Sequence, residues 1–241
     1  NTTMRRNPEK LGDWLHRCVD WAGSGKSQVL GYLLGVLSAF GVFLIMSGYA
    51  IEFGIFCCLL SFFHMWEYLY NAMFHPDNVT IDSYLLNHSR EYQFAMLFAI
   101  AEYIVEAFLF PSLKRPTWIT YVATFVAIFG QIIRTTSMAT AGVSFNHVIQ
   151  TERADSHKLI THGIYSILRH PSYFGWFYWS IATQFILANP LSILGYSYFT
   201  FVFFKQRIRE EEDELHVMFG EPYVKYARKT YIGIPGIYSK Y

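Results

Sequence analysis

The sequence has few charged residues. Asp, Glu, Lys and Arg make up 15% of its 241 residues, against about 25% in a typical soluble domain. The formal net charge is +1, so the chain lacks the basic excess with which proteins bind nucleic acid. These shortages exclude an ordinary soluble enzyme and a nucleic-acid-binding protein, and 53% hydrophobic residues exclude a disordered chain.

Several common site motifs are also missing. Three cysteines are too few for a disulfide framework. No Gly-x-Gly-x-x-Gly sequence begins a strand–helix unit, so a Rossmann cofactor site is not expected. Four histidines cluster between positions 147 and 170, but no pair has the His-Glu-x-x-His spacing of metal sites. We therefore predict no metal site.

The sequence is rich in long apolar runs instead. A membrane-spanning helix needs about 20 predominantly apolar residues. The uncharged run 171–204 is too long for one span, and Asn189-Pro190 near its centre is typical of a helix end, so we expect a hairpin of two short helices. The sequence then predicts an all-α, polytopic transmembrane helix bundle with six spans: Gln28–Tyr49, Phe53–Asn71, Tyr92–Phe110, Thr117–Ile133, Ser172–Ala188 and Leu191–Phe204.

Positive charge predicts the orientation of this bundle. Lys and Arg in short loops favour the cytosolic side. With a cytosolic N-terminus, 17 of the 19 Lys and Arg residues lie on that side, and only Lys114 and Arg115 lie opposite. Residues 1–27 are predicted to form an amphipathic segment in the membrane interface, or a helix packed on the bundle, and residues 28–133 to form four transmembrane helices.

Residues 134–241 are predicted to form the cofactor-binding and catalytic region, with the transmembrane hairpin 172–204 and a cytosolic C-terminal tail. Polar segments flank the hairpin on both sides and reach the same face of the membrane. Pro171 suits the first position of a helix, whose N-terminus favours an anion. Arg207 and Glu211 are one turn apart. They could hold a zwitterion or one end each of two ligands, or belong to a solvated helix.

Three carboxylates fall inside apolar runs, at Glu67, Glu102 and Glu106. Ionisable groups at such positions usually face the interior of a bundle. They could form a proton or ion path, but such a path usually has polar residues on several spans. We expect polar contacts between helices instead, with Asn71, Arg134 or a tyrosine as partners.

Six short motifs resemble one family of enzymes. They are SYLLNHS at 83–89, FNHVIQ at 145–150, RHPSY at 169–173, GWFYWS at 175–180, EEE at 210–212 and FGE at 219–221. Over residues 53–231 the chain resembles the isoprenylcysteine carboxyl methyltransferases, integral membrane enzymes that methylate the C-terminal prenylcysteine of CaaX proteins. Animal members of that family resemble eight-span proteins, whereas six spans are predicted here.

The resemblance implies a non-Rossmann site for S-adenosylmethionine, with Arg207 as the catalytic, substrate-binding residue. The cofactor contacts that it implies are Gln150, His157, Lys158, Leu159, Ile160, Tyr165, His170, Pro171, Ser172, Tyr173 and Glu211. It also implies prenylated CaaX proteins (farnesyl or geranylgeranyl) and membrane lipid as partners, and an endoplasmic reticulum location with the active site facing the cytosol.

The chemistry of such a reaction sets further expectations. A carboxylate is ionised at pH 7 and needs no general base, so catalysis is mostly positioning. The prenyl chain is expected to enter from the bilayer, because leaving it costs about 0.8 kcal/mol per CH₂ group. Aromatic residues at the cytosolic end of the hairpin are expected to line its tunnel, or else to face lipid: Tyr173, Trp176, Phe177, Phe201 and Phe204.

Three other functions stay open on the sequence. Phospholipid methyltransferases share the Arg-His-Pro-x-Tyr-x-Gly and glutamate core but methylate an amine, beside which Arg207 is unhelpful. Sterol reductases share the same core but resemble longer chains that use NADPH. A membrane scaffold or transporter without enzymatic activity explains the polar segments around the hairpin poorly.

Overall fold

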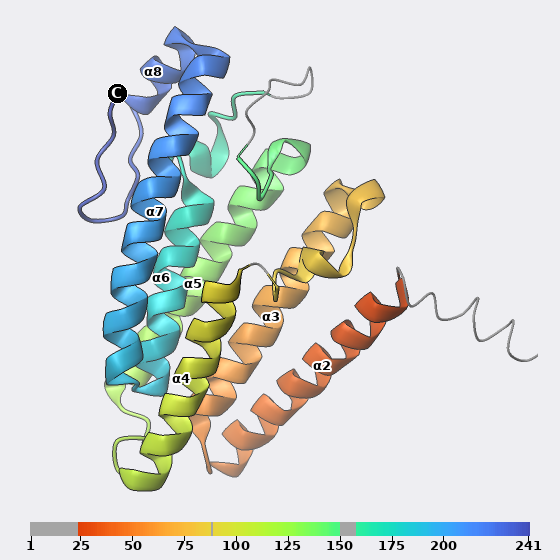
Figure 1. The fold of residues 1–241 in the computed structure, drawn as a ribbon, viewed down its shortest axis with the longest axis vertical. Coiled ribbons are helices and arrows are strands. Elements are labelled where there is room, and N and C mark those ends of the chain that lie inside the picture. Colours follow the sequence, from red (N-terminus) through yellow and green to blue (C-terminus); the bar gives the residue numbers. More distant parts are fainter. Residues whose placement is uncertain (1–23, 88, 150–157) are drawn as a thin grey trace, which may run out of the picture.

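The computed structural model describes residues 24–87, 89–149 and 158–241. The regular elements in these ranges are helices, which run side by side as one bundle (Figure 1). The α-helices are α2 (Ser24–Ser47), α3 (Ile51–Phe74), α4 (Arg90–Leu109), α5 (Trp118–Ala141), α6 (Pro171–Leu187), α7 (Pro190–Phe219) and α8 (Glu221–Ala227). Short 3₁₀ helices are η1 (Pro76–Asn78), η2 (Ile81–Tyr84), η3 (Gly142–Ser144) and η4 (Gly163–Ser166). The all-α prediction is confirmed.

Four helices of the described part, α2 to α5, are long and apolar enough to cross a membrane by length and composition. The hairpin is formed by α6 and α7. Helix α7 is 30 residues long and continues to Phe219, beyond the predicted end at Phe204. Its second half carries Arg207 and Glu211 on continuous helix. Most of the predicted interfacial segment 1–27 lies outside the described residues.

Helices α5 and α6 pack closely because glycines face each other between them. A Cβ atom added to Gly130 of α5 would lie 2.6 Å from the carbonyl oxygen of Gly175 in α6. Small residues at such crossings let two helix backbones approach closely. This contact fixes the beginning of α6, which carries the RHPSY motif, against the second half of α5.

The turn between α6 and α7 is held by buried charges. Ala188 adopts a left-handed conformation there, with φ of 51°. The Nζ of Lys114 donates to the carbonyl oxygens of Leu187 and Ala188, both at 2.8 Å, and pairs with Glu106 at 2.7 Å. A cation therefore lies at the C-terminal end of α6, where the helix dipole favours it.

Glu102 completes this arrangement on the other side of the turn. Its carboxylate accepts the backbone N–H groups of Leu191 and Ser192, at 2.7 and 2.8 Å. An anion at the beginning of α7 complements that end of the helix dipole. The contacts of Glu102 and Glu106 are thus polar joints between helices, as the sequence predicts, made with α7 and with Lys114 of the α4–α5 connection.

The residues after α8 fold back onto the hairpin. The backbone N–H of Arg169 donates to Tyr231 O at 3.0 Å, and the N–H of Tyr231 donates to Ile167 O at 2.9 Å. Beyond these bonds, three isoleucines pack on the hairpin helices and form one apolar cluster. Its buried members are Phe177, Phe204, Ile208, Ile232, Ile234 and Ile237. The predicted cytosolic tail is therefore a packed part of the fold.

Candidate functional site

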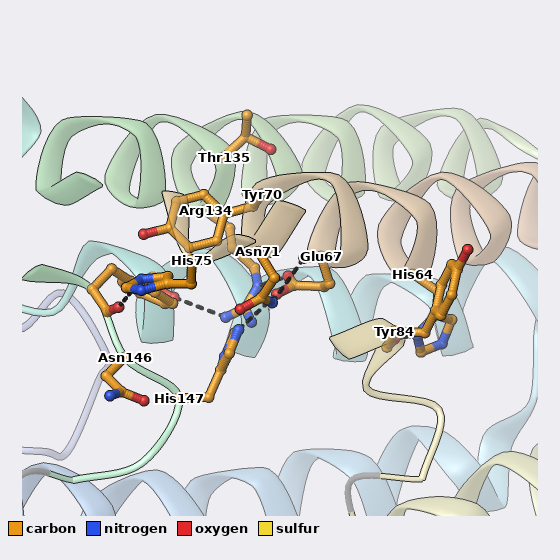
Figure 2. A network of polar contacts seen from close by, with 12 residues as sticks. His64, Glu67, Tyr70, Asn71, His75, Tyr84, Arg134, Thr135, Asn146 and His147 are labelled. Carbon is orange, nitrogen blue, oxygen red and sulfur yellow. Dashed lines mark hydrogen bonds and ion pairs between the residues drawn. The ribbon is translucent and has the colours of Figure 1, made fainter. Parts of the chain in front are cut away.

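The connection between α5 and α6 carries the FNHVIQ motif, and α3 holds it in place. The hydroxyl of Tyr70 donates to the carbonyl oxygen of Gly142 at 2.5 Å, and a ring N–H of His75 donates to that of Phe145 at 3.1 Å. Figure 2 shows Asn146 and His147 on the strand of chain that follows these bonds. The end of α3 therefore places both residues.

A buried ion pair lies next to this connection. The Nε of Arg134 donates to Glu67 Oε1 at 2.5 Å, and the side chain of Glu67 is fully buried. The His147 ring points toward the same carboxylate (Figure 2), with 3.5 Å between Nε2 and Oε2. A second nitrogen of Arg134 donates to Ser172 Oγ at 2.8 Å. This ion pair thus joins α3, α5 and the beginning of α6.

A cavity of about 140 Å³ lies beside the beginning of α6, and we call it the polar cavity. Nine of the predicted cofactor residues are described by the structure, and all nine line it: Lys158, Leu159, Ile160, Tyr165, His170, Pro171, Ser172, Tyr173 and Glu211. Gln150 and His157 lie outside the described residues. Segments far apart in the sequence therefore meet here, although cofactor binding by these residues stays a prediction.

The polar cavity suits a ligand that has both charged and flat apolar parts. The carboxylate of Glu211 can accept from a cation, and the beginning of a 17-residue helix at Pro171 favours an anion. Burial, followed by the charge of Glu211, raises the pKa of Tyr165, so its hydroxyl stays a donor at neutral pH. Leu159 and Ile160 supply an apolar surface.

A second cavity adjoins the first, and we call it the aromatic cavity. It is lined by Phe63, Leu85, Tyr92, Arg134, Phe145, Asn146, His147, Ser172, Tyr173, Trp176, Phe203 and Arg207. Four of these residues, from Phe145 and Asn146 in the connection and Ser172 and Tyr173 in α6, also line the polar cavity. The two cavities therefore share a wall.

The Tyr173 hydroxyl stands between Arg207 and Glu211 at this shared wall. It donates to the Glu211 carboxylate and accepts from Arg207 Nε at 3.1 Å. Another Arg207 nitrogen donates to the carbonyl oxygen of His147 at 2.6 Å. Arg207 lines the aromatic cavity and Glu211 the polar one. The spacing of Arg207 and Glu211 is compatible with one zwitterionic ligand, with two ligands or with a solvated helix. This geometry favours two ligands, with one charged group for each.

Known proteins with similar sequences decide the family. Residues 122–217 match the model of the isoprenylcysteine carboxyl methyltransferase (ICMT) family. A protein-S-isoprenylcysteine O-methyltransferase of Dictyostelium discoideum is 48% identical over 187 residues, which cover 77% of this chain and 78% of the relative. The chain belongs to the isoprenylcysteine carboxyl methyltransferase family.

Other comparisons agree with this assignment. A Xenopus laevis protein-S-isoprenylcysteine O-methyltransferase is 49% identical over 185 residues, covering 77% of this chain. The chain spans 64% of that relative's length, just under two thirds. The solved structure of a eukaryotic intramembrane Ras methyltransferase ICMT superposes with a TM-score of 0.82 at 40% identity, over 85% of this chain and 74% of the other. The transmembrane bundle is therefore that of the ICMT family of integral membrane proteins.

The predicted aromatic wall of this ICMT-family bundle is only partly found. Tyr173 and Trp176 line the aromatic cavity. Phe177 and Phe204 are buried under the C-terminal tail instead, and Phe201 packs against the same cluster. The prediction for these three residues is wrong because no pattern in the sequence indicates that the tail folds back over them.

Sequence reasoning missed several residues that line the aromatic cavity. Phe203 lies four residues before Arg207, so helical spacing could have found it. Phe63 shares a face of α3 with Glu67 by the same spacing. Arg134 and Tyr92 carry no such signal, because their places depend on how α4 and α5 pack. Leu85 belongs to the SYLLNHS motif, and the residue types of that motif do not by themselves indicate a role.

An ion pair between Arg169, which lines the polar cavity, and Glu212 fixes the cavity wall. Arg169 pairs with Glu212 at 3.3 Å, and the His170 ring lies 3.5 Å from the same carboxylate. Burial raises the pKa of Glu212, but the facing His170 and the charge of Arg169 together outweigh burial and lower it. Glu212 is therefore an anion at neutral pH that holds the first residues of α6.

Proposed function

We propose that this chain transfers a methyl group from S-adenosylmethionine to the C-terminal carboxylate of a prenylated cysteine, in processed CaaX proteins, and so forms the methyl ester. One observation carries the proposal: two adjoining cavities meet at Tyr173, with Glu211 lining one and Arg207 lining the other. The names of the relatives support the same reaction, since they are protein-S-isoprenylcysteine O-methyltransferases.

The polar cavity fits S-adenosylmethionine by the chemistry of its lining. Glu211 can accept hydrogen bonds from the ammonium group, and the beginning of α6 around Ser172 can bind the carboxylate. Tyr165 offers an aromatic face, which attracts a cation, and Leu159 and Ile160 offer apolar contact to adenine. When bound, this donor supplies a methyl group on positively charged sulfur, which an ionised carboxylate accepts without a base.

Arg207 has the main role on the acceptor side. Its guanidinium is always charged and can bind a carboxylate through two parallel hydrogen bonds. The bonds to Tyr173 and His147 fix its direction, so the acceptor carboxylate is oriented toward the wall that the two cavities share. Trp176 and Phe203 reduce the access of water to that point. Desolvation favours this reaction because opposite charges disappear in it.

The aromatic cavity suits the prenyl part of the acceptor. Aromatic side chains from α3, α4, α6 and α7 line it, and α7 reaches it from within the apolar half of the hairpin. A prenyl chain that stays in apolar surroundings on its way from the bilayer avoids a cost of about 0.8 kcal/mol per CH₂ group. We infer that membrane-embedded prenylated proteins reach Arg207 from the lipid side.

We also infer that the polar cavity opens to the cytosol, in the endoplasmic reticulum membrane. The predicted distribution of Lys and Arg supports the orientation, since 17 of the 19 are expected on one side of the membrane and Lys114 and Arg115 on the other. The location follows from the family resemblance and from the need for a cytosolic methyl donor.

One assay tests both the reaction and the orientation. Sealed microsomes that contain the protein are given labelled S-adenosylmethionine, which does not cross the membrane, and N-acetyl-S-farnesylcysteine. We expect labelled methyl ester at the same rate before and after the membrane is permeabilised. If methyl ester forms only after permeabilisation, the site faces the lumen and the proposed orientation is wrong. Label on phosphatidylethanolamine and none on the prenylcysteine replaces the proposed reaction with phospholipid N-methylation.

A further inference from the structure

The proposed reaction alone does not explain the SYLLNHS motif. The motif lies in the connection between α3 and α4, which turns back along α3 before α4 begins (Figure 1). Two residues from this part of the chain, Leu85 of the motif and Tyr92 of α4, line the aromatic cavity. The connection is therefore part of the cavity wall, and its contacts show how it is held there.

Tyr84 fixes the backbone next to Leu85. Its hydroxyl donates to the carbonyl oxygen of Ser27 at 2.9 Å, and its ring stacks on that of Tyr68 with centroids 4.3 Å apart. Its own carbonyl oxygen accepts from His64 Nδ1 at 2.7 Å. Tyr84 is 2% exposed, so the residue before Leu85 is bound to α2 and α3 from three sides.

Leu85 itself adopts an unusual conformation. Its φ is 58°, in the left-handed region, which costs a non-glycine residue about 1–2 kcal/mol. Glycine or asparagine would serve the turn with less strain. Backbone strain of this kind often accompanies a functional position. A leucine at a turn that glycine would adopt with less strain indicates that its side chain has a use, and Leu85 is one of the residues that line the aromatic cavity.

Tyr92 is positioned by the same histidine. A carbonyl oxygen can only accept, so His64 Nδ1 carries a proton, and in a neutral ring Nε2 then accepts from the Tyr92 hydroxyl at 3.0 Å. The backbone N–H of Tyr92 donates to Ser89 Oγ at 3.1 Å. His64 is completely buried. One histidine thus fixes both the connection and the first turn of α4.

The path that the acceptor's prenyl chain must take through the aromatic cavity gives Leu85 and Tyr92 a role. Arg207 lies beside the polar cavity, and Trp176 and Phe203 lie one helical turn farther along α6 and α7. The free space in the aromatic cavity is about 40 Å³, room for only a few water molecules. A prenyl chain anchored by its carboxylate therefore has to press against the lining, and the α5–α6 side is fixed by the Gly130–Gly175 contact.

We propose that Leu85 and Tyr92 contact the prenyl chain and determine which chain length the enzyme prefers. This inference rests on the proposed function and adds the acceptor's lipid as the group that the α3–α4 connection recognises. A larger side chain at Leu85 shortens the space for the chain, and a smaller one at either position lengthens it. The donor site is untouched, because neither residue lines the polar cavity.

The test compares two acceptors, N-acetyl-S-farnesylcysteine and N-acetyl-S-geranylgeranylcysteine, which is one isoprene unit longer. The measured quantity is the ratio of their kcat/KM values in detergent. We expect Leu85→Trp to lower the value for the longer acceptor about tenfold more than that for the shorter one. Leu85→Ala and Tyr92→Leu should shift the ratio the other way. The KM for S-adenosylmethionine should stay within about twofold.

Leu86 provides the matched control. It is the neighbouring leucine of the same motif and does not line the aromatic cavity. Leu86→Trp and Leu86→Ala should leave the ratio unchanged. If Leu85→Trp does not fold, Leu85→Ala and Tyr92→Leu decide, since both remove atoms. An active wild type with an unchanged ratio in these two variants overturns this inference alone. A wild type that methylates neither acceptor overturns the proposed function, and the inference with it.

Discussion

Tyr173 is the residue at which the two halves of the site meet. Its hydroxyl donates to Glu211 and accepts from Arg207, so a cation and an anion on adjacent turns of α7 are held apart and turned toward different cavities. Without this hydroxyl the two charged groups could pair with each other, as residues four apart on a helix commonly do. In the proposed reaction the tyrosine would keep each group available for its own ligand.

The first prediction separates the roles of Arg207 and Glu211. Arg207→Ala should reduce kcat/KM for the prenylcysteine at least about tenfold, a loss of about 1.4 kcal/mol, with little change in the affinity for S-adenosylmethionine. Glu211→Gln keeps the size but loses the charge, so S-adenosylmethionine should bind more weakly by about 1.5–3 kcal/mol. Steady-state kinetics measures the first effect and titration calorimetry the second.

Exposed neighbours on α7 serve as controls for both variants. Arg209 and Glu210 are exposed, and Glu210 only accepts from Gln206 at 2.8 Å. Arg209→Ala and Glu210→Gln should leave both measurements unchanged. Equal losses for both ligands in Arg207→Ala and Glu211→Gln would mean that the pair acts as one structural unit and not as two binding groups.

At this scale the sequence predicted the residues with a regular spacing and missed those placed by packing. Arg207 and Glu211 follow from one turn of helix. The residues of the RHPSY motif follow from the start of α6 and from the family resemblance. Arg134 is expected from the sequence only as one of several polar partners for the buried carboxylates, because its pairing with Glu67, which lies 67 positions away in the chain, depends on packing. Such a pair becomes visible only when α3 and α5 are packed together.

At the scale of elements, the hairpin of α6 and α7 depends on charges at the end opposite the site. Lys114 binds two carbonyl oxygens at the end of α6, and Glu102 binds two N–H groups at the beginning of α7. The sequence predicts the turn from Asn189-Pro190 and predicts polar joints for Glu102. It does not predict the role of Lys114, because a lysine in a short loop indicates only which side of the membrane the loop occupies. The side chain is in fact buried, with 8% of the residue exposed.

The second prediction concerns Lys114. Lys114→Met removes the cation and leaves Glu106 and the carbonyl oxygens of α6 without their partner. Breaking a buried ion pair in this way typically costs about 3–5 kcal/mol. We expect a clearly lower thermal unfolding midpoint in detergent, together with an unchanged KM for S-adenosylmethionine in the folded fraction, because the polar cavity lies at the other end of α6.

The adjacent Arg115 is the control for this change, since it is exposed. Arg115→Met should leave the unfolding midpoint nearly unaltered. A Lys114→Met protein with normal stability but no activity would contradict the structural role, and would favour an ion or proton path through Glu102 and Glu106.

At the scale of the whole molecule, the C-terminal tail closes the bundle behind the site. Arg169 donates to Thr230 O at 3.0 Å and to Ser239 Oγ at 2.8 Å, and Ser239 also donates to Glu212 at 3.1 Å. These bonds join the last residues of the chain to the beginning of α6 and to α7. The tail therefore supports the polar cavity from behind, through Arg169 and Glu212, although no tail residue after 227 lines it.

The third prediction follows from the charge of Glu212, which makes tail docking depend on pH. His170 and Arg169 overcome the effect of burial and lower the pKa of Glu212 below its ordinary value of 4.5. A group whose pKa is lower in the folded state stabilises the fold above its unfolded pKa, and this stabilisation is lost as the pH falls through the folded value. The difference in thermal midpoint between wild type and Glu212→Gln should therefore be largest above pH 4.5 and shrink as the pH falls below it.

Asp213→Asn is the control. It changes an exposed pair with Lys240 and should have a small effect on the thermal midpoint at every pH. A difference between wild type and Glu212→Gln that is constant from pH 3 to 7, measured by thermal unfolding in a detergent that does not titrate, would show that the Glu212 carboxylate is not charged more readily in the folded protein and that tail docking does not depend on its charge.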